Sequence, residues 1–170
     1  MIGLLDGTID WDLLAESYGG PGGLLNVDVS ADDVARELSG RLVYLATPYT
    51  KQVRDAETGK FVLWMGEGMA QEAARWSAIL AASGITAISP IVAAQAIIET
   101  DASGGIDPFD HKFWTDWCWP LLTRSQAVVV PPIVGWERSS GVFCEAAHAL
   151  RAVKRVMVIK DDMKRRRCRG

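Results

Sequence analysis

From Arg41 onward, short apolar runs alternate with longer segments whose apolar residues keep helical spacing. The runs predict buried strands at 42–46, 86–89, 127–130 and 155–159. The segments between and after them predict helices at 62–82, 91–99, 108–124 and 141–153. Strands that alternate with helices form a parallel sheet covered on both faces. We therefore expect an α/β fold, a flavodoxin- or Rossmann-like doubly wound parallel sheet of about four to five strands in a three-layer sandwich.

The first 40 residues differ from the rest and predict an extension with short helices, not a second domain. The stretch Gly19-Gly20-Pro21-Gly22-Gly23 interrupts any regular structure. Before it, Asp10 to Ser17 predict one short helix, and after it Ser30 is placed to cap a helix that ends at Gly40. The expected division is an extension at 1–40, a main domain at 41–163 and a basic tail at 164–170. We expect the tail to be solvated, with a phosphate or nucleic-acid contact as the alternative.

The composition favours a single globular domain in the cytoplasm. With 170 residues, of which 49% are hydrophobic and 23% charged, the chain can bury a substantial core. A net charge of −3 gives no reason to expect a nucleic-acid partner. No apolar run approaches ~18 residues and no signal peptide is evident, so no membrane partner is expected.

The cysteines and histidines do not predict a metal or disulfide framework. Cys118, Cys144 and Cys168 form no CxxC pair and are odd in number, and the first two are expected to be buried thiols. His148 follows Glu145 at the spacing of carboxylate-bridged metal sites, but a second such pair is missing. Because glycine-rich dinucleotide and P-loop motifs are also missing, we expect neither a metal nor a cofactor.

The segment from Gly135 to Glu145 carries the strongest functional signal. It follows the apolar strand 127–130 and enters a helix, so it crosses the edge where open α/β sheets bind ligands. Ser139, Ser140 and Gly141 lie at the turn, where backbone N–H groups can receive an anion. Glu145 lies about one turn further on, in an apolar stretch, and needs either an arginine partner or a chemical role.

Two further elements are expected at the same edge. Tyr44 and Tyr49 flank the end of the first strand and can hydrogen-bond a ligand or a carboxylate, although aromatic packing is the simpler interpretation. Asp116 lies between Trp114 and Trp117, an apolar setting that can raise a carboxyl pKa, with an exposed helix position as the alternative. The same helix contains Asp110, His111 and Pro120, and the proline is expected to kink or split it.

Two carboxylates near a sugar can perform glycosyl chemistry. We expect Glu145 to attack or stabilise the anomeric carbon and Asp116 to give a proton to the leaving base. Ser139, Ser140 and the amides at the helix start are expected to hold a phosphate or a sugar hydroxyl.

The strand Val43-Tyr44-Leu45-Ala46-Thr47-Pro48-Tyr49, followed by Gly135-Trp136, Ser139, Gly141 and Glu145, resembles the nucleoside 2-deoxyribosyltransferase-like superfamily. Within it, the chain is similar to the DUF1937 family over about residues 41–160. The resemblance implies cleavage or transfer of an N-glycosidic bond, with Glu145 as catalytic glutamate, Tyr44 orienting it and Asp116 near the base. The substrate-binding residues expected at this edge are Thr47, Pro48, Tyr49, Trp136, Ser139, Ser140 and Gly141.

The resemblance also bears on the substrate. Relatives that act on free deoxynucleosides carry an aspartate six residues before the glutamate, whereas related nucleotide N-glycosidases place a serine there to hold the 5′-phosphate. Ser139 occupies that position here, and a hydroxyl suits a dianion because it donates a hydrogen bond without adding negative charge. A nucleoside 5′-monophosphate is thus favoured over a nucleoside. Relatives often begin strand three with an aspartate, where this chain has Ser125-Gln126.

Two other classes of function remain open. The chain could be a non-catalytic protein that binds nucleotides or ADP-ribose-like ligands in the same cleft, or a structural oligomer with a vestigial cleft. Members of the superfamily tend to form dimers or larger assemblies, so a homo-oligomer is expected. The tryptophan-rich helix around 113–119 can supply an apolar interface, with core packing as the alternative.

Overall fold

The computed structural model describes residues 8–101 and 103–161, and it confirms the doubly wound α/β fold. Its sheet is parallel throughout, with the strand order β1-β5-β4-β2-β3. The strands are β1 (Leu25–Val29), β2 (Leu42–Leu45), β3 (Thr86–Ile88), β4 (Ala127–Val130) and β5 (Arg155–Ile159). The last four are the strands that the sequence predicted. The basic tail and Cys168 lie outside the described residues.

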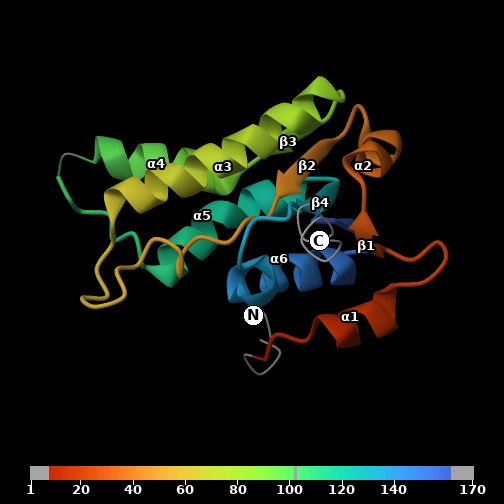
Figure 1. The fold of residues 1–170 in the computed structure, drawn as a ribbon, viewed down its shortest axis with the longest axis horizontal. Helices are drawn as coiled ribbons and strands as arrows, with labels where there is room; N and C mark the ends of the chain where they lie inside the picture. Colours follow the sequence, from red (N-terminus) through yellow and green to blue (C-terminus); the bar gives the residue numbers. More distant parts are fainter. Residues whose placement is uncertain (1–7, 102, 162–170) are drawn as a thin grey trace, which may run out of the picture.

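The helices cover both faces of the sheet (Figure 1). They are α1 (Trp11–Tyr18), α2 (Ala31–Leu38), α3 (Leu63–Ala82), α4 (Pro90–Thr100), α5 (His111–Arg124) and α6 (Ser140–Arg151), with a short 3-10 helix η1 (Trp136–Arg138) before α6. The buried residues form one core against α2 and α3 and a second against α1, α5 and α6. Successive residues along β2 and just after it divide between the two cores, since Val43 and Leu45 belong to the first and Tyr44 and Ala46 to the second.

The place where the strand order reverses lies between β2 and β4. The chain leaves β2 toward α3 on one face and leaves β4 toward α6 on the other. The two connections therefore part at the carboxyl ends of neighbouring strands, which opens the crevice in which such sheets bind ligands. The residues that follow β2 and β4 are the ones that this topology brings together.

The amino-terminal extension contributes a strand to this sheet. Its two short helices agree with the prediction, and α2 begins with a capping box between Ser30 and Asp33. Strand β1, which the sequence pattern did not predict, pairs with β5 along the outer edge. Its sequence Leu-Asn-Val-Asp-Val is half-exposed, and its pairing with β5 shifts between Asn26 and Val29. Numbered from β2, the order 2-1-3-4 is flavodoxin-like, and β1 takes the place of the fifth strand.

Helix α5 runs unbroken through Pro120, so the expectation that the proline would split it is wrong. Pro120 is exposed, and at the surface the helix carbonyl that loses its N–H donor can turn to water. The far end of α5 is held by Lys154, whose Nζ donates to the carbonyl oxygens of Leu122, Thr123 and Ser125 at 2.9, 2.7 and 2.7 Å. A cation at a helix carboxyl end satisfies the last carbonyls and opposes the helix dipole.

Candidate active site

Tyr44 and Glu145 meet between the sheet and α6. Tyr44 is the third residue of β2 and is only 1% exposed, because its ring lies in the core beneath α6. Glu145 lies in the second turn of α6 and is half-buried. The Tyr44 hydroxyl donates a short hydrogen bond to Glu145 Oε1. This contact joins residues 101 positions apart, and it gives the glutamate the partner that its apolar surroundings require.

Burial governs the ionisation of this pair. It raises the pKa of Glu145 from 4.5 to about 7, and the hydrogen bond from Tyr44 opposes that rise. Burial, with the nearby charge of Glu145, also raises the pKa of Tyr44 well above 10. Tyr44 therefore remains a neutral donor at neutral pH, while Glu145 is divided between its acid and carboxylate forms.

Cys118 approaches the pair from α5, a neighbour that the sequence pattern did not suggest. Burial and the adjacent Glu145 raise the pKa of its thiol to about 11, so it remains protonated. Cys144, predicted to be buried, is exposed. It immediately precedes Glu145 in α6. Adjacent helix residues point in different directions, so Cys144 faces solvent when Glu145 faces the core.

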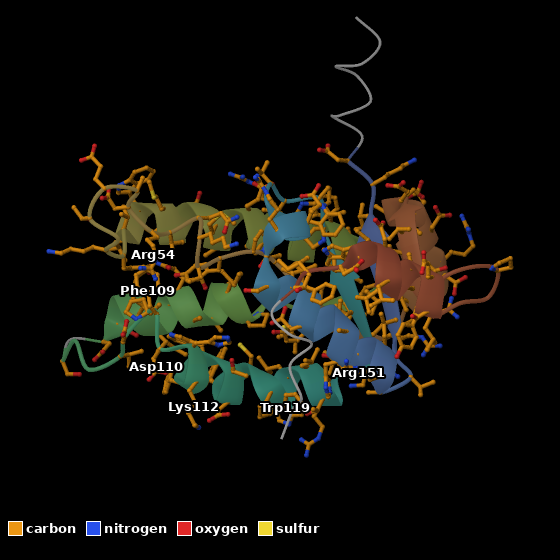
Figure 2. The ribbon with its side chains drawn as sticks, turned by 90° about the horizontal axis from the view of Figure 1, so that it is seen from below. Arg54, Phe109, Asp110, Lys112, Trp119 and Arg151 are labelled. Atoms are coloured by element: carbon orange, nitrogen blue, oxygen red, sulfur yellow. The ribbon has the colours of Figure 1, made fainter. Side chains whose placement is uncertain are left out.

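Asp116 lies on the outer side of α5, and the expected apolar surroundings are wrong. Its side chain is 66% exposed and forms an ion pair with Lys112 one turn earlier. In Figure 2, Lys112 lies along the outer edge of α5. Two residues further on, Cys118 points to Glu145, and helix positions two apart lie on nearly opposite faces. The structure therefore does not bring Asp116 to Glu145.

Ser139 is the amino-terminal cap of α6. Its hydroxyl accepts a hydrogen bond from the backbone N–H of Val142 at 3.4 Å, while Ser140 and Gly141 are exposed. The first backbone N–H groups of this 12-residue helix have no carbonyl partner within the helix. Together with the helix dipole, they make this end favourable for negative charge.

The residues that follow β2, which were expected to bind the substrate, are largely occupied by packing within the protein. Thr47 and Pro48 are buried. The Tyr49 hydroxyl donates to Gln95 Oε1 at 2.7 Å, and Gln95 Nε2 donates to Glu99 at 2.8 Å. Burial, with nearby Glu99, raises the pKa of Tyr49 to about 12. Tyr49 is thereby engaged with α4, whereas the Thr47 hydroxyl has no hydrogen-bond partner within the described residues.

Trp136 packs under the amino-terminal extension. Its ring meets Trp11 edge to face at 5.1 Å between centroids, and Trp11 meets Phe143 in the same way at 5.4 Å. The Trp11 indole N–H donates to the carbonyl oxygen of Glu137 at 3.1 Å. The turn between β4 and α6 is thus covered by α1, which the sequence did not place there.

A cavity of about 370 Å³ opens beside this turn, where the connections from β2 and β4 part. It is lined by Gln52, Met69, Glu72, Arg138 and the residues from Pro132 to Gly135. Gly135 has φ 93°, a left-handed conformation that favours glycine, and a Cβ there would also displace the Gln52 amide. Lys51 reaches across and donates to the carbonyl oxygen of Arg138 at 3.0 Å. A larger hollow of about 550 Å³, beside α3 and β3, has no titratable side chain in its lining.

Lys51, Gln52 and Arg138 were not predicted. Their position in the connections after β2 and β4 was the available signal, because those connections flank the reversal of strand order.

The connection after β2 is tied to the segment before α5. The guanidinium of Arg54 lies 4.0 Å from the centre of the Phe109 ring, and Figure 2 shows the two side chains together. Phe61, further along the same connection, packs edge to face on Phe109 at 6.1 Å. A cation over an aromatic face is stabilising, so the middle and the end of this loop are both held against Phe109.

Nothing in the described part of the chain has the donor set of a metal centre. His148, the residue three after Glu145, packs against Trp119 with ring centres 4.4 Å apart. No group of three or more His, Cys, Asp and Glu side chains that could hold an ion is present among residues 8–101 and 103–161. Over the same residues, each helix is too short or too polar to cross a membrane.

Residues 41–161 match the family described as "Domain of unknown function (DUF1937)". No curated protein and no solved structure matches the chain. The matched range includes Tyr44, Ser139 and Glu145 and leaves out α1, β1 and α2.

Proposed function

The chain belongs to the DUF1937 family, and from this premise we propose that it cleaves or transfers the N-glycosidic bond of a nucleoside 5′-monophosphate or nucleoside. The observation that carries the proposal is the hydrogen bond from Tyr44 to Glu145. A half-buried carboxylate with a neutral phenol donor is oriented and only weakly solvated, which suits attack on a sugar carbon.

In the first step, the Glu145 carboxylate attacks C1′ of the sugar. An ester bond forms between Glu145 and C1′ while the bond from C1′ to the base nitrogen breaks. The electron pair of that bond leaves with the base, which takes up a proton. Tyr44 remains protonated and keeps one glutamate oxygen in place, so the other is directed at the sugar.

In the second step, water or another base attacks C1′. The ester bond breaks, its electron pair returns to Glu145, and the attacking group loses its proton to solvent. Water as the attacking group gives hydrolysis, and a second base gives transfer.

The polar end of the substrate fits the turn before α6. The backbone N–H groups at the start of α6 and the Ser139 hydroxyl favour an anion, and Lys51 and Arg138 add positive charge beside them. This arrangement supports a 5′-monophosphate rather than an uncharged nucleoside. The cavity beside Gly135 adjoins this turn through Arg138, although neither Ser139 nor Glu145 is in its lining.

The proton that the departing base requires is assigned to solvent, since Asp116 is 66% exposed and paired with Lys112. The alternative is that Asp116 supplies it, as the resemblance implied. The variant Asp116→Asn distinguishes these two sources of the proton. Loss of a general acid lowers kcat about 100-fold or more, whereas loss of an exposed ion pair changes kcat by no more than about twofold.

The experiment is a panel of nucleoside monophosphates and nucleosides, incubated with the wild type and with Glu145→Gln, in which free base is measured by chromatography. We expect base release from at least one monophosphate, and a loss of at least about 1,000-fold in Glu145→Gln. Wild-type release no greater than that of the variant would refute the proposed activity.

Two substitutions at Ser139 test the substrate class. Aspartate is as good a helix cap as serine, so Ser139→Asp keeps the start of α6 and adds a negative charge. We expect it to weaken binding of monophosphates about tenfold or more and to leave nucleosides little affected. Ser139→Ala removes the cap as well and serves as the comparison for stability.

A binding protein without turnover is the second candidate class, and the same panel distinguishes it. Ligand-dependent thermal stabilisation without base release would favour that class. The observation in its favour is that burial raises the pKa of Glu145 to about 7, and the acid form cannot attack a sugar.

Self-association is proposed from the exposed apolar residues near the start of α3 and α5. Leu63, Trp64 and Phe113 are 46%, 67% and 41% exposed. Large exposed apolar side chains of this kind are frequent in interfaces between subunits. Light scattering coupled to gel filtration measures the mass directly, and a monomer at micromolar concentration would contradict this expectation.

A further inference from the structure

The segment before the matched family range is packed on the substrate turn. Helix α1 contacts both α6 and β1. Its first residue, Trp11, donates its indole N–H to the carbonyl oxygen of Glu137, 126 positions away. Glu137 lies in η1, two residues before Ser139. The hydrogen bond therefore fixes the backbone that leads into the cap of α6.

The Trp11 ring also packs on residues before and after Ser139. It packs edge to face on Trp136, which begins η1, and on Phe143, in the first turns of α6. Such ring pairs are favourable beyond the area that they bury. Ser139 lies between Trp136 and Phe143, so the three contacts bracket the residue that is proposed to meet the phosphate.

Helix α1 is itself anchored on either side of Trp11. Asp10 caps it by accepting from the N–H of Leu13 at 2.8 Å. Leu14, one turn after Trp11, is 5% exposed and belongs to the core that includes Tyr44 and Phe143. Trp11 therefore contacts the turn from a helix that is itself fixed in the core.

We infer that Trp11 is a positioning residue for the substrate turn, so that the amino-terminal extension forms part of the site. The role rests on the proposed function, since it concerns how the turn receives the phosphate. Trp11 contacts Trp136, Glu137 and Phe143, whereas Glu145 is held by the hydroxyl of Tyr44. Loss of Trp11 is therefore expected to weaken substrate binding and to leave the chemical step largely intact.

Three variants test this inference. Trp11→Phe removes the N–H donor and keeps an aromatic ring, Trp11→Ala removes both, and Leu14→Ala is the control that damages the core beside the same helix. The first measurement is amide hydrogen exchange of residues 136–143, compared with β4 at 127–130 in each variant. We expect the exchange rate at 136–143 to rise about tenfold in Trp11→Phe, which is the effect of about one lost hydrogen bond. The exchange rate of β4 should not change. The control should raise exchange in both segments together.

The second measurement is the kinetics with the best monophosphate of the panel. We expect KM to rise about tenfold in Trp11→Phe with kcat within about twofold, a pattern that reports lost ground-state binding. Unchanged exchange at 136–143, an equal rise in β4, or an unchanged KM would each overturn the inference. If the wild type releases no base at all, the proposed function fails, and the exchange measurement alone still decides whether Trp11 holds the turn.

Discussion

Replacing Glu145 by glutamine is expected to change how stability depends on pH. In the folded protein the pKa of Glu145 is raised from 4.5 to about 7, so the folded state holds this proton more tightly than the unfolded chain. The resulting stabilisation is complete below about pH 4.5 and is lost as pH rises to about 7 and beyond. At about 1.4 kcal/mol per pH unit, that interval corresponds to about 3 kcal/mol. Glutamine does not titrate and keeps nearly the same shape.

The assay is urea unfolding of the wild type and Glu145→Gln at a series of pH values from 4 to 8.5. The quantity of interest is the difference between their free energies of unfolding, because every other titrating group cancels. We expect this difference to move by about 3 kcal/mol in favour of the glutamine variant between pH 4.5 and pH 8.

A difference that stays constant with pH would refute the reasoning, since it would mean that Glu145 titrates alike in the folded and unfolded states. Tyr44→Phe supplies an internal check. The Tyr44 hydrogen bond lowers the pKa of Glu145, so the pH-dependent loss of stability should extend to higher pH in that background.

Three more outcomes are expected. The kcat/KM of the wild type should rise with pH through about 7 as Glu145 becomes a carboxylate, and Tyr44→Phe should move that midpoint upward; a profile flat from pH 5 to 9 would contradict a nucleophilic Glu145. Lys154→Met should lower the free energy of unfolding by about 1–3 kcal/mol because three carbonyls at the end of α5 lose their donor. Lys112→Met, which breaks an exposed ion pair, should lower it by less than about 1 kcal/mol. Equal losses in the two variants would argue against Lys154 as a stabilising cap of α5. Gly66→Ala should destabilise the protein by about 1–3 kcal/mol because its Cβ would overlap the buried Gln95 side chain. Gly68→Ala has open space around it and should stabilise the protein by up to about 1 kcal/mol. Chemical denaturation of both variants measures these changes, and equal effects would contradict the expected clash at Gly66.

The sequence was sufficient for the fold where strands are buried on both faces. The run Ala127-Val128-Val129-Val130 is entirely buried, and such continuous apolar runs have few interpretations besides a central parallel strand. Strand β1 could not be found in this way, because it lies at the edge and is half polar. Its place in the sheet depends on pairing with β5, at the opposite end of the described chain, and local pattern contains no information on such contacts.

The candidate site was predicted in part for a similar reason. Glu145 stood out as a carboxylate in an apolar stretch, and Tyr44 proved to be its partner. Asp116 has aromatic neighbours in sequence, but adjacent helix residues do not share a face, so those neighbours did not determine its surroundings. Trp136 and Tyr49 carry polar tips that a ligand could use, yet Tyr49 bonds to Gln95 and Trp136 packs on Trp11. Which of several possible partners a side chain takes is decided by tertiary packing.

The pairing of β1 with β5 has a consequence for how the chain is made. On a ribosome, β1 emerges about 125 residues before β5, the strand with which it pairs, and at cellular rates of synthesis that is roughly 6 to 25 seconds. Throughout that interval Trp11 also lacks the turn on which it packs. The segment with α1 and β1 is thus synthesised well before the residues that hold it, and the proposed phosphate site would be completed only when the two ends of the described chain meet.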